Sequence, residues 1–139
     1  MDYKEVLKEL DDLRDKILVC IRLERDRLQE KAKEVAFNNH KDILYICSRI
    51  GMVSVEDICS PTRIKEVVQI RQIYCYLMYK NTGLSLKDIG EIVGRDHATI
   101  IYMRDSIKHE IKSYYKNGYD PRGTVGILKA IQEISDLQY

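Results

Sequence analysis

The stretch Ser85–Ile107, "SLKDIGEIVGRDHATIIYMRDSI", decides the fold because two helical patterns flank a single glycine. Ser85, with Asp88 three residues later, has the pattern of a capping box at the start of a helix. Gly94 then predicts a turn. Asp96 is a natural N-cap for a second helix, and apolar residues follow it at helical spacing: Ile100, Met103, Ile107 and Ile111. The sequence therefore predicts a helix-turn-helix, with helices over 85–93 and 96–111.

The second predicted helix buries one face and leaves the other in water. Its first turn would expose His97, Ala98 and Thr99, with Tyr102 one turn later. Small and hydrogen-bonding residues at this position suit entry into the major groove, where the first residues of a recognition helix touch base edges. The free N–H groups of a helix start also attract phosphate. The pattern predicts a surface that binds duplex DNA.

The adjacent Asp96 and His97 could instead suggest catalysis. Neighbouring residues on a helix point about 100° apart, so Asp96 is poorly placed to orient His97 as a base. The chain has no His-x-x-x-His pair and no nucleophile with a local signature. We expect no enzymatic activity, no metal and no cofactor. For His97, simple helix capping remains the alternative to contact with a base or a phosphate. For Arg95, the alternative to DNA contact is a solvated residue in the turn.

The same stretch closely resembles the C-terminal DNA-binding domain of the bacterial replication initiator DnaA, whose signature reads "S-L-x-x-I-G … G-R-D-H-T-T-V". Upstream, "VVQIRQIYCYLMYKNTG" and "SVEDICSPTR" extend the resemblance to about residues 41–111. The resemblance implies an all-α, Trp-repressor-like fold that binds double-stranded DNA sequence-specifically, in replication or transcription control.

The resemblance also implies roles for individual residues. His97 and Ala98 would read bases in the major groove, and Asp96 would cap the helix and accept from a base amine. Thr99 would hold a phosphate or a base. Arg63 would contact the minor groove. Four residues would contact the sugar-phosphate backbone: Arg71, Gln72, Ser85 and Lys87. The position of Arg95 in the turn before the second helix predicts a further contact with DNA.

This chain departs from the family signature at Ala98, where the family has threonine. Alanine keeps a methyl group that can pack on a thymine methyl, but it lacks the hydroxyl. The family's two glycines before the arginine are reduced to Gly94, and the basic loop keeps only Arg63 and Lys65. We therefore expect a DNA specificity different from the usual site of the family.

Residues 1–38 form a segment of their own, predicted as one long helix with a possible role in homodimerisation. Its apolar seam follows a 4-3-4-3 spacing: Val6, Leu10, Leu13, Ile17 and Cys20. About 34 helical residues would span ~50 Å, too long to lie entirely on a small domain. A helix broken near Arg25 and folded back is the alternative to pairing with another chain. "NNH", Asn38–His40, is predicted to break the helix and to cap the next one.

The prediction divides the rest of the chain into a DNA-binding domain, 39–116, and a C-terminal helix packing on that domain or on a partner, 117–139. Within the domain, a helix over 64–80 precedes the helix-turn-helix, and "SYYKNGYDPRG" is a turn region. The last helix is predicted over 121–138, with its apolar residues directed inward: Val125, Leu128, Ile131, Ile134 and Leu137.

The net charge, the absence of certain motifs and the cysteine spacing limit the function further. The 139 residues carry a net charge of +1, so any DNA binding must come from a local arrangement of charge. A protein-interaction module on a helix-turn-helix that has lost DNA binding is therefore the alternative function. No phosphate-binding G-x-x-x-x-G-K-[ST] motif occurs, so we expect no nucleotide and a stand-alone member of the family.

The four cysteines lack metal spacing and predict reduced, mostly buried thiols. With no signal peptide or membrane span in the sequence, a cytoplasmic protein is expected.

Overall fold

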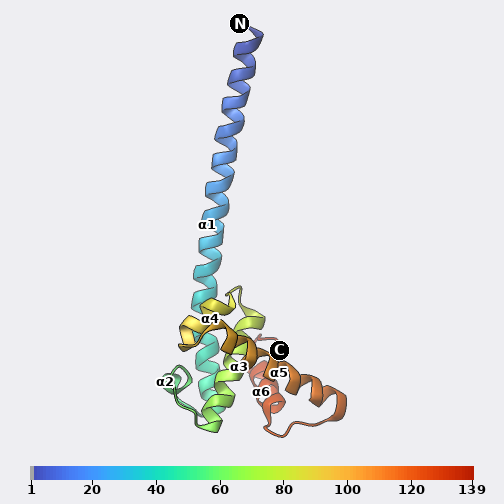
Figure 1. Cartoon of the computed structure of the whole chain (residues 1–139). Helices are drawn as coiled ribbons and strands as arrows, with labels where there is room; N and C mark the ends of the chain where they lie inside the picture. Colours follow the sequence, from blue (N-terminus) through green and yellow to red (C-terminus); the bar gives the residue numbers. More distant parts are fainter. Residues whose placement is uncertain (1) are drawn as a thin grey trace. The chain divides into compact units, whose positions relative to one another are not determined.

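The computed structural model describes residues 2–139, apart from the side chains of residues 32–39, and the regular structure in this range is entirely helical. The helices are α1 (Tyr3–Gly51), α2 (Val55–Ile58), α3 (Lys65–Asn81), α4 (Leu86–Val93), α5 (His97–Asn117) and α6 (Thr124–Ile134) (Figure 1). The predicted all-α class is confirmed. The chain divides into two compact units, one ending at Val35 and the other spanning Ala36–Tyr139.

Helix α1 continues through Asn38–His40 to Gly51, so the predicted break at "NNH" is wrong. The sequence up to residue 50 contains no glycine or proline, the two residues that most strongly oppose a helix. His40 does not cap a new helix: it is buried, and its Nδ1 lies 3.3 Å from the hydroxyl of Tyr74. The predicted capping role of Asn38 lies outside the described side chains. His40 therefore anchors the end of α1 in the core of the second unit.

Helix α3 is the centre of the second unit. It contacts α2, α4, α5 and α6, and every residue from Ile70 to Met78 is buried. A helix surrounded on all sides must be largely apolar around its circumference, which explains why the pattern of α3 shows no clear polar stripe. The core that surrounds it draws on α1 through Ile43 and Cys47, and on α5 through Ile100 and Ile107.

The ends of α4 and α5 follow the predicted local signals. Ser85 and Asp88 form the capping box of α4, and Asp96 caps α5. Helix α5 continues to Asn117, so the turn predicted from Ser113 begins too early. The segment "SYYKN" contains neither glycine nor proline, and the helix stops only at Gly118.

Helix α6 packs against α3 and α5 and is shorter than the predicted 121–138. Val125, Leu128 and Ile131 are buried as predicted, whereas Ile134, at the last helical position, is 61% exposed. The carboxylate of Asp120 accepts hydrogen bonds from the N–H groups of Val125 and Gly126, both at 3.2 Å. These bonds satisfy helix-start donors that the N-cap residue, a glycine, cannot satisfy with a side chain.

The four thiols occupy different environments. Cys47 and Cys75 are buried, and burial raises the pKa of each to about 12. Cys59 is half-buried and Cys20 is exposed, so two of the four thiols are fully buried where most were predicted to be. Across residues 2–139, no helix has both the length and the apolar character needed to cross a bilayer.

Candidate nucleic-acid interface

Two glycines set the geometry of the turn between α4 and α5. Gly94 has φ of 71°, in the left-handed region that side chains other than glycine rarely adopt. Gly90 is buried, and a Cβ at this position would collide with the backbone carbonyl of Arg95. The N–H of Arg95 donates to the carbonyl of Gly90 at 2.8 Å. The close approach of the turn to α4 therefore requires glycine at 90 and fixes where α5 begins.

The first turn of α5 presents the residues predicted to read DNA. His97 and Ala98 are exposed, and Tyr102, one turn later, is 69% exposed. Asp96 Oδ1 accepts from the N–H of Thr99 at 2.9 Å and from its hydroxyl at 2.7 Å. These bonds lower the pKa of Asp96. The carboxylate thus acts as a helix cap bonded to Thr99, and the Thr99 hydroxyl can accept a further hydrogen bond but has already used its proton.

Arg71 does not lie where the sequence predicts. Its side chain is 2% exposed, and the guanidinium donates to four backbone carbonyls at 2.7–3.1 Å: those of Asp57, Ile58, Ser60 and Thr62. Burial lowers the pKa of Arg71. The predicted contact with the DNA backbone is therefore wrong for this structure, because the charge is enclosed and its donors hold the loop between α2 and α3.

Arg95 ties the same loop to the helix-turn-helix. Its Nη1 donates to the carbonyl of Val93 at 2.6 Å, and its Nη2 donates to the carbonyl of Ser60 at 2.9 Å. The Ser60 carbonyl also accepts from Arg71 at 2.8 Å. Arg95 is half-buried, so it is not simply a solvated turn residue. The shared carbonyl links α3, the loop and the start of α5, and the exposed Arg63 follows it three residues later in the same loop.

Gln72 is also withdrawn from the surface. It is 7% exposed, and its Oε1 accepts from Nη2 of Arg122 at 3.0 Å. Arg122 in turn makes two bonds to the carboxylate of Glu110, at 2.6 and 2.7 Å, which raise the pKa of Arg122. The predicted backbone contact of Gln72 is wrong here, because the segment that joins α5 to α6 occupies its side chain.

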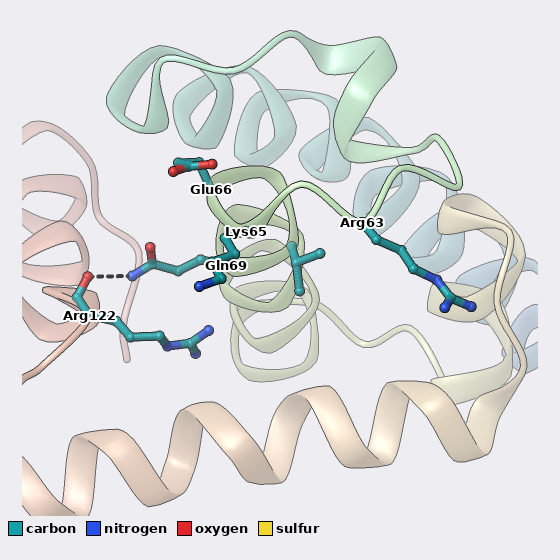
Figure 2. A pocket seen from close by; sticks show the side chains of 6 residues that line it. Arg63, Lys65, Glu66, Gln69 and Arg122 are labelled. Carbon is teal, nitrogen blue, oxygen red and sulfur yellow. Dashed lines mark hydrogen bonds between the residues drawn. The ribbon is translucent and has the colours of Figure 1, made fainter.

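A basic groove lies along the start of α3 (Figure 2). It has a volume of about 530 Å³ and is lined by Arg63, Lys65, Glu66, Val68, Gln69 and Arg122. Gln69 Nε2 donates to the carbonyl of Arg122 at 2.8 Å, the dashed line in Figure 2, and holds the α5–α6 segment in place. Arg63 and Arg122 extend on opposite sides of α3. Sequence reasoning did not place Arg122 here, because 59 residues separate it from Arg63 and no local pattern marks the contact.

Two further predicted residues lie at the start of α4. Ser85 is committed to the capping box: its Oγ accepts from the N–H of Asp88 at 3.1 Å, and its own N–H donates to the Asp88 carboxylate at 3.4 Å. Lys87 is exposed at the second helical position. Ser85 thus shapes the helix start, and Lys87 adds a cation to it.

Additional cations lie along α5. Arg104 and Lys108 both stand over the ring of Tyr79, 4.8 and 5.2 Å from its centroid. Arg104 also pairs with Asp105 at 3.1 Å. An aromatic ring beneath a cation stabilises it without neutralising it, so Lys108 keeps its positive charge at the surface. In the described part of the chain, no group of three or more His, Cys, Asp or Glu side chains is arranged to hold a metal ion.

Comparison with known proteins agrees with this geometry. The family described as "Bacterial dnaA protein helix-turn-helix" matches residues 40–107, from the buried His40 to the middle of α5. The chromosomal replication initiator protein DnaA of Picosynechococcus sp. is 44% identical over 66 residues, covering 47% of this chain and 15% of that protein. The DnaA of Lachnoclostridium phytofermentans is 30% identical over 123 residues, covering 80% of this chain and 27% of that protein.

The DnaA of Gloeothece citriformis, at 46% identity over 66 residues, likewise covers 47% of this chain. The chain spans less than a third of the length of these relatives. Residues 40–107 form a helix-turn-helix domain of the bacterial DnaA family.

Proposed function

We propose that this protein binds double-stranded DNA sequence-specifically, with α5 as the recognition helix in the major groove, in the control of replication or transcription. The observation that carries the proposal is the first turn of α5. There His97 and Ala98 are exposed side by side on a helix start that Asp96 caps and the close turn at Gly90 fixes. A rigid helix start with exposed, small or hydrogen-bonding side chains is what reading base edges requires.

Each residue of this turn offers a distinct contact. The imidazole of His97 can donate or accept, and the methyl group of Ala98 fits against a thymine methyl. Asp96 uses only Oδ1 for its two bonds to Thr99, so Oδ2 is available to accept from the exocyclic amine of cytosine or adenine. Tyr102 extends the same exposed surface by one turn.

The proposed contacts with phosphates and the minor groove come from exposed cations beside this turn. Arg63 lies in the loop that Arg71 and Arg95 hold through the carbonyl of Ser60, and it is proposed to enter the minor groove. Lys87 at the start of α4 is proposed to contact phosphate. Arg71 has an indirect role, since it shapes the loop that presents Arg63 and is itself buried.

Salt dependence tests this proposal. Fluorescence anisotropy of a labelled duplex is measured against salt for the parent, Lys87→Ala and Lys41→Ala, a matched removal of an exposed lysine on α1 outside the interface. For each phosphate that a variant no longer neutralises, the slope of log K against log salt should become shallower by about 0.9. Lys87→Ala should weaken binding and flatten the slope, and Lys41→Ala should do neither. Equal effects of the two variants would contradict the assigned interface.

One observation favours a second candidate, a protein-interaction module on the same fold. Residues 36–139 hold fourteen basic and twelve acidic side chains, and two of the predicted DNA contacts, Arg71 and Gln72, are buried. The same titration separates the two functions, because a DNA-binding domain retains arbitrary duplex at low salt. Absence of any duplex binding at low salt would favour the interaction module. The proposed partners are otherwise double-stranded DNA and, through the N-terminal helix, a second copy of the chain.

A further inference from the structure

The N-terminal unit carries an apolar stripe along α1. Seven side chains recur at steps of three or four residues, apart from one gap at Glu24: Tyr3, Val6, Leu10, Leu13, Ile17, Ile21 and Leu28. At 100° per residue, they fall within an arc of roughly 80° on the helix surface. Their exposed fractions range from 37% for Val6 to 75% for Tyr3. Nothing within the N-terminal unit therefore covers the stripe.

Such a stripe needs a partner for the helix to be stable. The unit that ends at Val35 consists of one helix, so it offers no second element of its own on which to pack the stripe. The stability of helices in proteins comes mainly from packing of an amphipathic face rather than from intrinsic propensity. Outside the stripe, charged residues of the two signs occur in nearly equal numbers, and four further apolar side chains are exposed: Leu7, Leu18, Val19 and Leu23.

We propose that a second copy of the chain covers this stripe, in a parallel, in-register, two-stranded coiled coil over residues 3–28. The inference specifies the partner and orientation of the proposed homodimer and is independent of DNA binding. From Tyr3 to Cys20 the spacing is heptad, with Tyr3, Leu10 and Ile17 at a positions and with Val6, Leu13 and Cys20 at d positions. In a parallel pair, each apolar layer meets its own copy across the two-fold axis.

Charge complementarity supports this alignment. Glu9 occupies a g position and Arg14 the e position five residues later, so Glu9 of each copy faces Arg14 of the other. Within one chain, Arg14 makes two long, solvent-exposed ion pairs, at 3.6 Å to Asp11 and 3.9 Å to Asp15, so its guanidinium has room for a closer partner. The other g and e positions between residues 3 and 28 place no two like charges opposite each other.

The pattern changes after Ile17 in a way that a coiled coil accommodates. The next apolar residue on the stripe, Ile21, comes four residues later, which corresponds to a stutter that locally unwinds the supercoil. Glu24 follows at a stripe position, and Arg27 of the same helix pairs with it at 2.6 Å. The single polar layer is thus charge-compensated, and Leu28 resumes the apolar stripe.

Cys20 distinguishes the parallel pair from an antiparallel one. In the parallel pair, the two Cys20 side chains lie opposite each other at the edge of the seam. An antiparallel pair that matches the same heptads would place Cys20 against Tyr3 of the other copy. The two thiols would then be 17 residues apart along the helix, about 25 Å at 1.5 Å per residue. Cys20 is exposed in the single chain and accessible to a reagent.

The test uses the full chain without DNA, so that its outcome does not depend on the proposed DNA binding. Light scattering should give the mass of a dimer at micromolar concentration. Diamide, as the oxidant, should join the two Cys20 thiols in a disulfide and take up both electrons and both protons. A covalent dimer should form in the parent and not in Cys20→Ser. A monomer would overturn the homodimer, and an uncrosslinked dimer would overturn the parallel register.

Matched apolar-to-acidic variants test the stripe itself. Leu10→Asp/Leu13→Asp should give a monomer, whereas Leu18→Asp/Val19→Asp changes two equally exposed apolar residues outside the stripe and should remain dimeric. Circular dichroism reports whether the second unit stays folded in each variant. Dimerisation that survives in the stripe variant, or that is lost equally in both variants, would overturn the assignment of the interface.

Discussion

Replacing Arg71 with methionine should unfold the domain more readily without removing a DNA contact. Methionine keeps much of the apolar stem but loses the four hydrogen bonds to the loop carbonyls, which span 2.7–3.1 Å. At ~0.5–1.5 kcal/mol net for each bond, the sum is roughly 2–6 kcal/mol. Some carbonyls regain water when the loop opens, so we expect a loss of about 3 kcal/mol in the free energy of unfolding.

Urea unfolding followed by circular dichroism measures this loss directly, and thermal unfolding should show a Tm lower by ~12–24 °C at ~4–8 °C per kcal/mol. Arg63→Met is the matched control, since it removes the same charge from an exposed side chain and should change stability by less than about 0.5 kcal/mol. If Arg71→Met were as stable as the parent but bound DNA weakly, Arg71 would be a direct contact and its structural role would be refuted.

Three further variants test the turn, the cap and the α5–α6 segment. Gly90→Ala should lose ~1–3 kcal/mol in urea unfolding because its Cβ meets a backbone carbonyl, whereas Gly83→Ala, with open space around it, should be neutral or slightly stabilising. Because its pKa is lowered from 3.8, the Asp96 carboxylate stabilises the fold above that value, and this contribution is lost as the pH falls through the lowered pKa. Asp96→Asn, which caps without titrating, should show less acid-side loss in urea unfolding; an unchanged pH profile would count against the cap. Arg122→Ala should lower the free energy of unfolding by ~1 kcal/mol. A double-mutant cycle with Glu110→Ala should show a coupling free energy between the two side chains, and its absence would contradict the ion pair.

The helix-turn-helix could be predicted from sequence because its signals are local. The capping box at Ser85, the glycine at 94 and the cap at Asp96 each act within one turn of a helix. The buried stripe of α5 follows from periodicity alone, since Ile100, Met103 and Ile107 lie on one face. No knowledge of distant contacts is needed for any of these features.

The burial of Arg71 and Gln72 could not be predicted in this way. Arg71 is buried because a loop 9–14 residues earlier in the chain folds over it, and Gln72 because Arg122 arrives from 50 residues away. A family signature places both residues on the correct helix but does not show which partner each one meets. The continuation of α1 through His40 has a similar cause, since its contact with Tyr74 spans 34 residues.

The central claim is that the first turn of α5 reads DNA sequence. Selection of bound fragments from random duplex DNA, carried out in parallel with the parent and His97→Ala, tests this claim most directly. The parent should enrich a defined motif, and His97→Ala should lose ~1–3 kcal/mol of discrimination at one base pair while keeping the rest of the motif. An identical motif from both proteins, or no enrichment by the parent, would contradict the account.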